Sequence, residues 1–280
     1  MRLCLWLSIC LSASWVCADD AFLIGGPAVP EEGGADTPAS ADTTAANIHM
    51  IPEVPAYIWY HGCGPTSTGM IIGYWDAHGF DNLIVGGNDW TANLANVQNM
   101  IASPGHIRDY VPTPDRTPTL ADPYHADDCL ADFVGCSRDP LDHGWSYLDQ
   151  QSPGMFKYVT YRGYDGWEAS YTSGLANAWQ ALVQEVNAYR PAQLMVDSNG
   201  DGALDHFVTA IGYDDTPGAN RYAFLNTWDS QVHWAGWHKE QAGNPWGVYA
   251  ISMLDPVPEP SCALTLLLGI ALLRKRRADR

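Results

Sequence analysis

A cysteine held between two glycines, where a loop turns into a helix, constrains this chain more than any other feature. Gly62, Cys63 and Gly64 are followed at once by Pro65. Proline suits the first turn of a helix, because the N–H that it lacks would have no partner there. Apolar residues then recur at helical spacing. The sequence therefore predicts a helix that begins near Cys63 and stops before Gly79.

The position of this thiol allows two interpretations. Free backbone N–H groups and the positive end of the helix dipole lower the pKa of a thiol and favour the thiolate, which is the nucleophile. Cys63 is then an activated nucleophile. The alternative is a buried structural cysteine beside a tight turn, and this stretch alone leaves both interpretations open.

A second and a third stretch favour the nucleophile. Residues 205–213 alternate apolar side chains and predict a strand with His206 at its start. Residues 222–228 predict another strand, which ends in Asn226 and its two neighbours. A cysteine at a helix start, then a histidine, then an asparagine, all far apart in sequence, is the order of a Cys-His-Asn thiol protease.

These three motifs resemble those of papain-like cysteine peptidases. The resemblance rests on Gly-Cys-Gly at 62–64, on the Asp-His start and Gly-Tyr end of 205–213, and on Asn-Thr-Trp at 226–228. The helix start is also similar to the Gly-Cys-(Gly or Ser)-Pro-Thr start of the bacteriocin-processing branch. The resemblance implies an α+β, two-lobed papain-like fold, with the nucleophile on an N-terminal helix and an antiparallel sheet that carries the histidine and the asparagine.

The same resemblance implies a role for each residue. Cys63 would be the nucleophile, His206 the general base and acid, and Asn226 the group that orients the imidazole. The implied reaction is hydrolysis of peptide bonds in a peptide or protein substrate through a thioester intermediate. No cofactor is expected for catalysis.

One departure from the family pattern leaves the oxyanion hole and the function open. Tyr57 stands where these families usually have a glutamine that helps to build the hole. The backbone N–H of Cys63 is one candidate donor, and His61, Tyr57 or Trp59 is the second. Two alternative functions follow: a weak or inactive papain-like binding module of an extracellular matrix, and a transglutaminase-like Cys-His-Asp acyltransferase that uses the nearby Asp229.

Charge excludes one class of partner. The 280 residues carry a formal net charge of −18, and phosphate backbones repel such an acidic body, so nucleic acid is not an expected partner. The length allows one large domain or two small ones. We assign the peptidase domain to residues 51–255.

The N-terminal residues predict export. Residues 1–18 combine a positive start, an apolar run and a small-residue cleavage site, as in a secretory signal peptide; a lipoprotein anchor at Cys17 fits less well. Residues 19–50 are rich in Gly, Pro, Ala, Asp and Thr and predict a flexible linker or short pro-segment. The glycine pairs at 25–26 and 33–34 resemble double-glycine processing sites, a similarity that we attribute to composition.

The C-terminal residues 256–280 predict sorting at the cell envelope. Pro-Glu-Pro, an apolar run and a basic cluster follow one another, and this order resembles a PEP-CTERM segment. It implies an exosortase-type processing enzyme as a partner and transient membrane contact. The alternative is a plain membrane anchor, although the apolar run is shorter than the ~17–25 residues of a spanning helix. The predicted location is the cell envelope or the extracellular space.

Cysteine spacing predicts one disulfide. An exported protein meets an oxidising compartment, and the predicted domain holds Cys63, Cys129 and Cys136. Cys129 and Cys136 form the natural pair, which leaves Cys63 as a free thiol.

The middle of the chain gives few patterns. Helices are expected over 91–101 and 125–133, separated by a proline-rich loop. His106, His125 and His143 lie in or near these segments without a tight ligand spacing such as His-Glu-x-x-His. We therefore expect surface and loop histidines here, and a metal site is the alternative.

An acidic, glycine-containing turn predicts a calcium site. Residues 197–205 match the first nine positions of a calcium loop, including the glycine at position six, and the loop joins two predicted strands. Val208 stands where an EF-hand has its bidentate glutamate, so weak affinity is expected, and an acidic turn without metal is the alternative. The expected ligands are a backbone carbonyl and side-chain oxygens, from Ala203 and from Asp197, Asn199, Asp201 and Asp205.

Overall fold

The computed structural model describes residues 24–25, 47–108, 128–137 and 144–257. The predicted signal peptide, the PEP-CTERM segment, His125 and His143 lie outside these residues. Within the described part of the chain, no helix is both long and apolar enough to cross a membrane.

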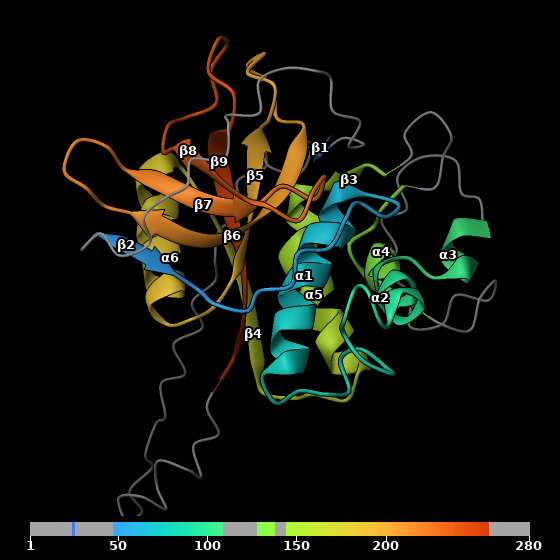
Figure 1. Ribbon diagram of the computed structural model, residues 1–280. Helices are drawn as coiled ribbons and strands as arrows, with labels where there is room; N and C mark the ends of the chain where they lie inside the picture. The colour runs from blue at the N-terminus through green and yellow to red at the C-terminus, as the bar shows by residue number, and fades with distance from the viewer. Residues whose placement is uncertain (1–23, 26–46, 109–127, 138–143, 258–280) are drawn as a thin grey trace, which may run out of the picture.

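The structure contains a seven-stranded antiparallel sheet (Figure 1). Its order is β4-β9-β5-β6-β7-β8, and β2 pairs with β6 beside this path. The strands are β2 Ile48–Met50, β4 Trp167–Ser173, β5 Ala192–Asp197, β6 His206–Asp214, β7 Arg221–Leu225, β8 Val232–Gly236 and β9 Gly247–Pro256.

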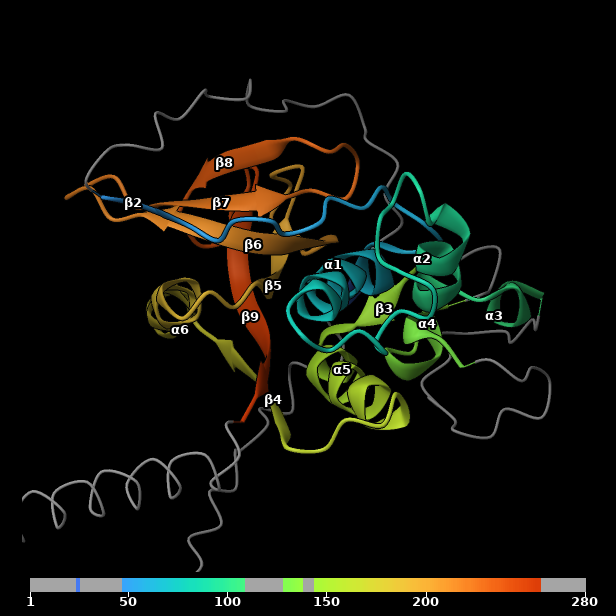
Figure 2. The same cartoon turned by 60° about the horizontal axis from the view of Figure 1, so that its bottom comes forward.

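Helices cover both faces of this sheet. Figure 2 shows α6 on one side of β9 and both α1 and α5 on the other, with α2, α3 and α4 lying beyond α1. The helices are α1 Cys63–Ala77, α2 Leu94–Ile101, α3 Pro104–Arg108, α4 Leu130–Phe133, α5 Leu148–Tyr161 and α6 Leu175–Asn187.

Strand β6 separates the buried clusters, because alternate side chains of a strand point to opposite faces. Phe207 packs in one cluster with Cys63, and Ile211 joins the core that α1 contributes to. Val208 lies in another cluster with Leu182 of α6. The strand that begins with His206 is thus fixed from both faces, and α1 packs directly against it.

The predicted α+β class, with an antiparallel sheet that carries His206, is confirmed. The helix from Cys63 ends at Ala77, two residues before Gly79, whose φ is +102°. The prediction missed α5 and β4. The buried face of α5 includes Gln151 and Ser152, so the helix shows no apolar stripe in the sequence.

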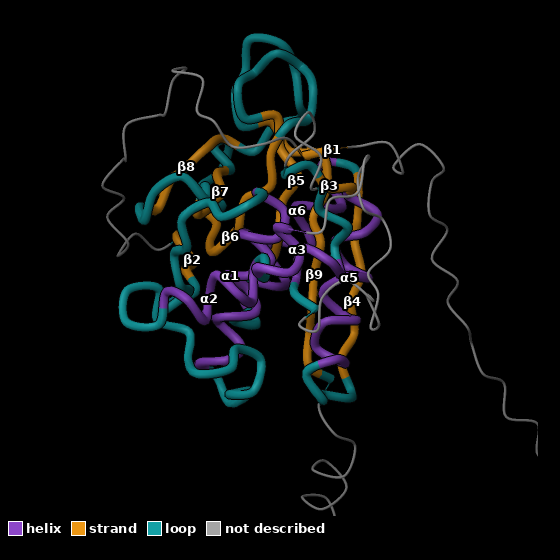
Figure 3. Tube along the Cα trace, turned by 90° about the vertical axis from the view of Figure 1, so that its right-hand side faces the viewer, coloured by secondary structure: helices purple, strands orange, loops and turns teal. Residues whose placement is uncertain are grey.

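A short strand from the N-terminal segment lies near the start of the sheet. β1, Ile24–Gly25, pairs antiparallel with β3, Ser146–Tyr147, and Figure 3 shows the two side by side. β1 also lies beside β6. This part of the predicted linker is therefore packed against the domain.

The predicted disulfide between Cys129 and Cys136 is wrong: among the described residues, neither sulfur forms a disulfide, and nor does that of Cys63. Cys129 begins α4 and directs its sulfur to Asp132 Oδ2, 3.0 Å away. Cys136 follows the helix and lies against Gly62. Helix α4 lies between the two cysteines in the sequence, and their sulfurs contact different residues.

Candidate active site

The two glycines beside the nucleophile are required by close packing. A Cβ added at Gly62 would lie 2.7 Å from Cys136 Sγ and 2.8 Å from the carbonyl oxygen of Gly144. A Cβ at Gly64 would collide with Ser146 Oγ. The segment that leads into β3 therefore lies directly on the start of α1, which only glycines permit.

Hydroxyl groups fix the start of α1 to the loop before it and to the sheet behind it. Thr66 Oγ1 donates to the Gly62 carbonyl oxygen at 2.6 Å and accepts from the Tyr60 N–H at 3.0 Å. Thr209 Oγ1 of β6 donates to the Ser67 carbonyl oxygen at 2.9 Å. The loop, the helix start and β6 are thus one rigid unit around Cys63.

The Cys63 sulfur is fully buried next to the start of β6. It accepts a hydrogen bond from the backbone N–H of Phe207, the residue that follows His206. Burial and, to a smaller extent, the charge of Asp205 together raise the pKa of the thiol to about 12, against the hydrogen bonds to the sulfur. The expectation of a lowered pKa is wrong for this conformation, because loss of solvent outweighs the helix start.

His206 is also buried, and its ring is held on one side. Nε2 lies 2.8 Å from the main-chain carbonyl oxygen of Asn226 and donates to it, so Nδ1 is the unprotonated nitrogen of the neutral ring. Burial lowers the pKa of His206 to about 4, against the effect of this hydrogen bond. Trp228 stacks on the imidazole with ring centroids 4.4 Å apart, which shields the bond from water.

Asn226 contacts His206 through its main chain and not through its side chain. Its Oδ1 accepts from the N–H groups of Trp228 at 2.9 Å and Asp229 at 3.1 Å, which closes the turn after β7. Thr227 in this turn has a φ of +69°. The resemblance implied an amide oxygen at the imidazole; the backbone oxygen of the same residue lies there instead.

Asp229 is engaged with another histidine. Its Oδ1 lies 2.9 Å from Nε2 of His233, a buried residue of β8. Because Asp229 pairs with His233, the carboxylate required by a Cys-His-Asp acyltransferase is directed away from His206.

Tyr57 does not serve the nucleophile. Its ring stacks on Trp90 and its hydroxyl donates to the Asn88 carbonyl oxygen at 2.8 Å. The hydroxyl lies against Gly73, ten residues along α1 from Cys63, or ~15 Å along the helix axis. Trp59, another residue considered for the oxyanion hole, packs against the hydrophobic cluster around Cys63.

Two buried glutamines near the nucleophile were missed by the sequence interpretation. Gln193 Nε2 donates to Ser67 Oγ at 2.7 Å and lies 3.2 Å from Gln151 Oε1. Gln151 Nε2 donates in turn to the Tyr147 carbonyl oxygen at 2.8 Å. Their hydrogen bonds connect Tyr147 of β3 to Ser67 of α1 beneath the nucleophile. A buried glutamine has no sequence signal of its own.

The predicted calcium loop is held by its own backbone. Asp197 accepts from the N–H groups of Gly200 at 2.7 Å and Gly202 at 2.8 Å. Asp205 Oδ1 accepts from the Ser198 N–H at 2.7 Å. The loop leads from β5 directly to His206, so its conformation fixes the start of β6.

The described residues contain one group of three potential metal ligands from His, Cys, Asp or Glu. It consists of His106, Cys129 and Asp132. The prediction that His106 is a surface or loop histidine is wrong, because its side chain is fully buried in α3.

The structure thus brings the buried thiol at the start of α1 against the start of β6, the strand that carries the fixed imidazole of His206. The chain belongs to the Peptidase_C39 like family, which matches residues 51–248, more than half of its length. It is a cysteine peptidase.

Among solved structures, the chain is similar to digestive procathepsin L 3 of Tenebrio molitor larval midgut. The sequence identity is 16%, the TM-score is 0.31, and the similarity covers 79% of this chain and 75% of that chain. No curated protein matches the chain. The family assignment therefore rests on residues 51–248 alone.

Proposed function

We propose that this peptidase is exported and hydrolyses peptide bonds through Cys63, His206 and Asn226. The observation that carries the proposal is the joining of α1 to β6: the Cys63 sulfur accepts from the N–H of Phe207. This contact brings the thiol to the residue that follows His206. The main-chain oxygen of Asn226 holds the imidazole from behind.

The chemistry follows from the neutral resting pair. As the Cys63 sulfur attacks the scissile carbonyl carbon, Nδ1 of His206 takes the thiol proton. The imidazolium, stabilised by its bond to the Asn226 oxygen, gives this proton to the leaving amine. Water then attacks the thioester, with His206 again as base, and releases the carboxylic acid and the free thiol. The backbone N–H of Cys63 is the first oxyanion donor.

We also propose that residues 19–50 act as a pro-segment. Ile24 and Gly25 pair with β3, and Ser146 of β3 lies against Gly64 beside the nucleophile. Pairing at this position would restrict entry of substrate to the buried thiol. Removal of the segment would therefore open the site.

The test is a comparison of the chain with and without residues 1–46. Iodoacetamide or a thiol-directed epoxide should label Cys63 several-fold faster in the shortened chain, and a peptide substrate should be turned over faster. The Cys63→Ser form of each chain is the matched control for labelling at Cys129 and Cys136. Labelling without any turnover over a broad peptide library would refute the peptidase proposal and favour the inactive binding module.

Export and sorting are proposals of the same kind. Residues 1–18 would be removed as a signal peptide, and residues 256–280 would be removed by an exosortase-type enzyme after transient membrane contact. Mass spectrometry of the cell-envelope and extracellular fractions should find chains that lack Arg274 and the residues after it. An intact C-terminus in the envelope would support the plain anchor.

We further propose that the loop from Asp197 to Asp205 binds calcium. Support comes from its place before His206 and from the mutual proximity of its charges: burial raises the pKa of Asp205, and the charges of Asp197 and Asp201 raise it further against the hydrogen bonds from Ser198. A divalent cation would relieve this repulsion and steady the start of β6.

A further inference from the structure

A second group of a cysteine, a histidine and an aspartate is buried outside the active site. Cys129 caps the start of α4, Asp132 lies in its first turn, and His106 comes from α3. Nδ1 of His106 is 2.6 Å from Asp132 Oδ1, and the Cys129 sulfur is 3.0 Å from Asp132 Oδ2. One ligand atom of each residue lies within 4.8 Å of the others.

We propose that His106, Cys129 and Asp132 bind one zinc ion. An imidazole nitrogen, a thiolate and a carboxylate oxygen are the ligand types that zinc takes, and a water completes the tetrahedron when a protein supplies three of them. On binding, the Cys129 thiol loses its proton to solvent and its sulfur bonds to the metal. The thiol proton is therefore released when zinc binds.

Hydrogen bonding alone leaves this cluster incomplete. The side chain of His106 is fully buried, and its Nε2 has no hydrogen-bond partner among the described residues. Buried polar atoms without a partner are uncommon and call for a physical account. A metal ion gives one, because the imidazole then uses a nitrogen as a ligand in addition to its contact with Asp132.

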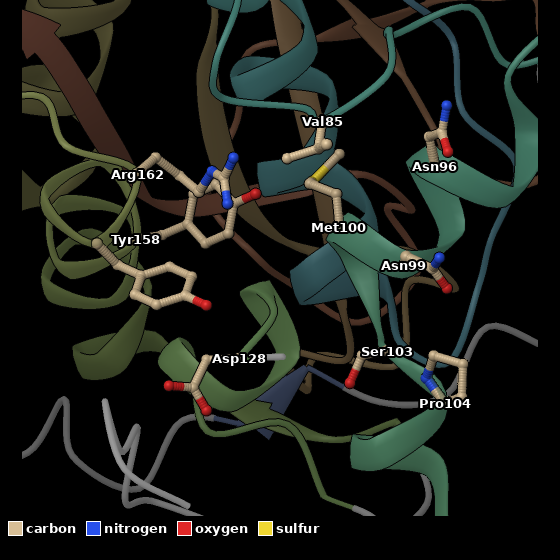
Figure 4. A pocket seen from close by; sticks show the side chains of 10 residues that line it. Val85, Asn96, Asn99, Met100, Ser103, Pro104, Asp128, Tyr158 and Arg162 are labelled. Atoms are coloured by element: carbon tan, nitrogen blue, oxygen red, sulfur yellow. The ribbon is translucent and has the colours of Figure 1, made fainter. Parts of the chain in front are cut away.

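A cavity gives the ion a route to the cluster. Its volume is about 380 Å³, and Ser103 and Asp128 both line it (Figure 4). Asp128 directly precedes Cys129, and Ser103 Oγ accepts from the His106 N–H at 3.1 Å. The cavity thus reaches the residues next to two of the ligands, and it carries a carboxylate that attracts a cation.

The site also lies close to the loop that carries the nucleophile. The ring of His61, two residues before Cys63, packs edge-on against His106 with centroids 4.8 Å apart. Bound zinc would therefore hold α3 and α4 together behind this loop.

The experiment uses the full chain with Cys63→Ser, so that the nucleophile cannot bind metal. The metal-free protein is titrated with zinc by calorimetry and with cobalt(II) by absorption. We expect one zinc per chain, one proton released, and a sulfur-to-cobalt charge-transfer band. Adding Cys129→Ser should abolish the band and weaken zinc binding at least tenfold, and Asp132→Asn should weaken it similarly. Cys136→Ser, the matched control at the other buried cysteine, should change neither.

Circular dichroism shows whether each variant is folded, and Asp132→Asn keeps the test informative if Cys129→Ser does not fold. Absence of stoichiometric zinc binding by the parent chain would overturn the proposal. So would a charge-transfer band that survives Cys129→Ser or disappears with Cys136→Ser. None of these outcomes depends on peptidase activity, so the zinc proposal and the proposed reaction can fail separately.

Discussion

Two buried regions of this peptidase each contain a cysteine and a histidine, but they connect them differently. At the active site, backbone groups hold both residues: the Phe207 N–H binds the Cys63 sulfur, and the Asn226 oxygen binds the His206 ring. In the second region, one carboxylate joins Cys129 to its histidine. The backbone contacts leave Nδ1 of His206 available for proton transfer, whereas in the second region the Asp132 carboxylate contacts both the thiol and the imidazole.

The difference shows which physical feature makes a thiol reactive. All three described cysteines are buried, and burial raises the pKa of both Cys63 and Cys129. At Cys129 the negative charge of Asp132 raises it further. Proximity of a thiol to an imidazole is therefore not enough to make the thiol reactive. The imidazole must present an unprotonated nitrogen, and no carboxylate should lie between the two.

The largest expected effect comes from exchanging one sulfur in each region. Cys63→Ser should reduce kcat/KM by at least about 10⁴-fold, because it removes the nucleophile. Cys129→Ser should change kcat/KM by less than about tenfold, because a serine hydroxyl can still donate to Asp132. Steady-state kinetics on one peptide substrate compares the two directly. A comparable loss in both variants would show that the regions do not differ as we describe.

The second effect concerns the group behind His206. If the side chain of Asn226 held the imidazole, its removal should cost about 10⁴-fold, as for an orienting triad residue. Because the main-chain oxygen holds it, Asn226→Ala should lose the bonds that close the turn and the 3.0 Å contact of its Nδ2 with His233, together worth about 1–2 kcal/mol, or about tenfold in rate.

Two controls sharpen this prediction. Asn226→Asp keeps an oxygen for the turn but places a carboxylate oxygen beside Asp229, where Nδ2 lies 3.5 Å from Oδ2, so any loss that it shares with Asn226→Ala comes from the amide nitrogen and not from the turn. Asp229→Ala should have little effect, because Asp229 pairs with His233. A severe loss in Asp229→Ala together with a mild one in Asn226→Ala would favour the Cys-His-Asp acyltransferase.

The third effect is the pH dependence of labelling. A thiol with a pKa of about 12 and an imidazole with a pKa of about 4 form a neutral pair at pH 7. Only the thiolate reacts, so the rate of iodoacetamide labelling at Cys63 in the full chain should rise about tenfold per pH unit between pH 6 and 9. A plateau in this range would mean that the resting site already holds a thiolate–imidazolium pair.

The sequence predicted those parts of the site that depend on local patterns. Cys63 at a helix start and His206 at a strand start each followed from a few neighbouring residues. The raised pKa of Cys63, the free state of Cys129 and the burial of His106 did not, because each depends on packing between distant segments. The prediction named Asn226 but not the contacting atom, since a turn conformation decides whether the side chain or the backbone meets the imidazole.

The smallest expected effect is the stabilisation of the fold by calcium bound to the loop before His206. Calcium at about ten times its Kd should stabilise the fold by about 1.4 kcal/mol, which raises Tm by about 3–5 °C. Asp201→Ala should remove this shift, whereas Asp165→Ala, at an exposed aspartate outside the loop, should retain it. Because the charge of Asp205 raises the pKa of Cys63, calcium should also speed labelling of Cys63 modestly. An equal Tm with calcium and with EDTA would show that the loop binds no calcium and is held by its backbone hydrogen bonds alone.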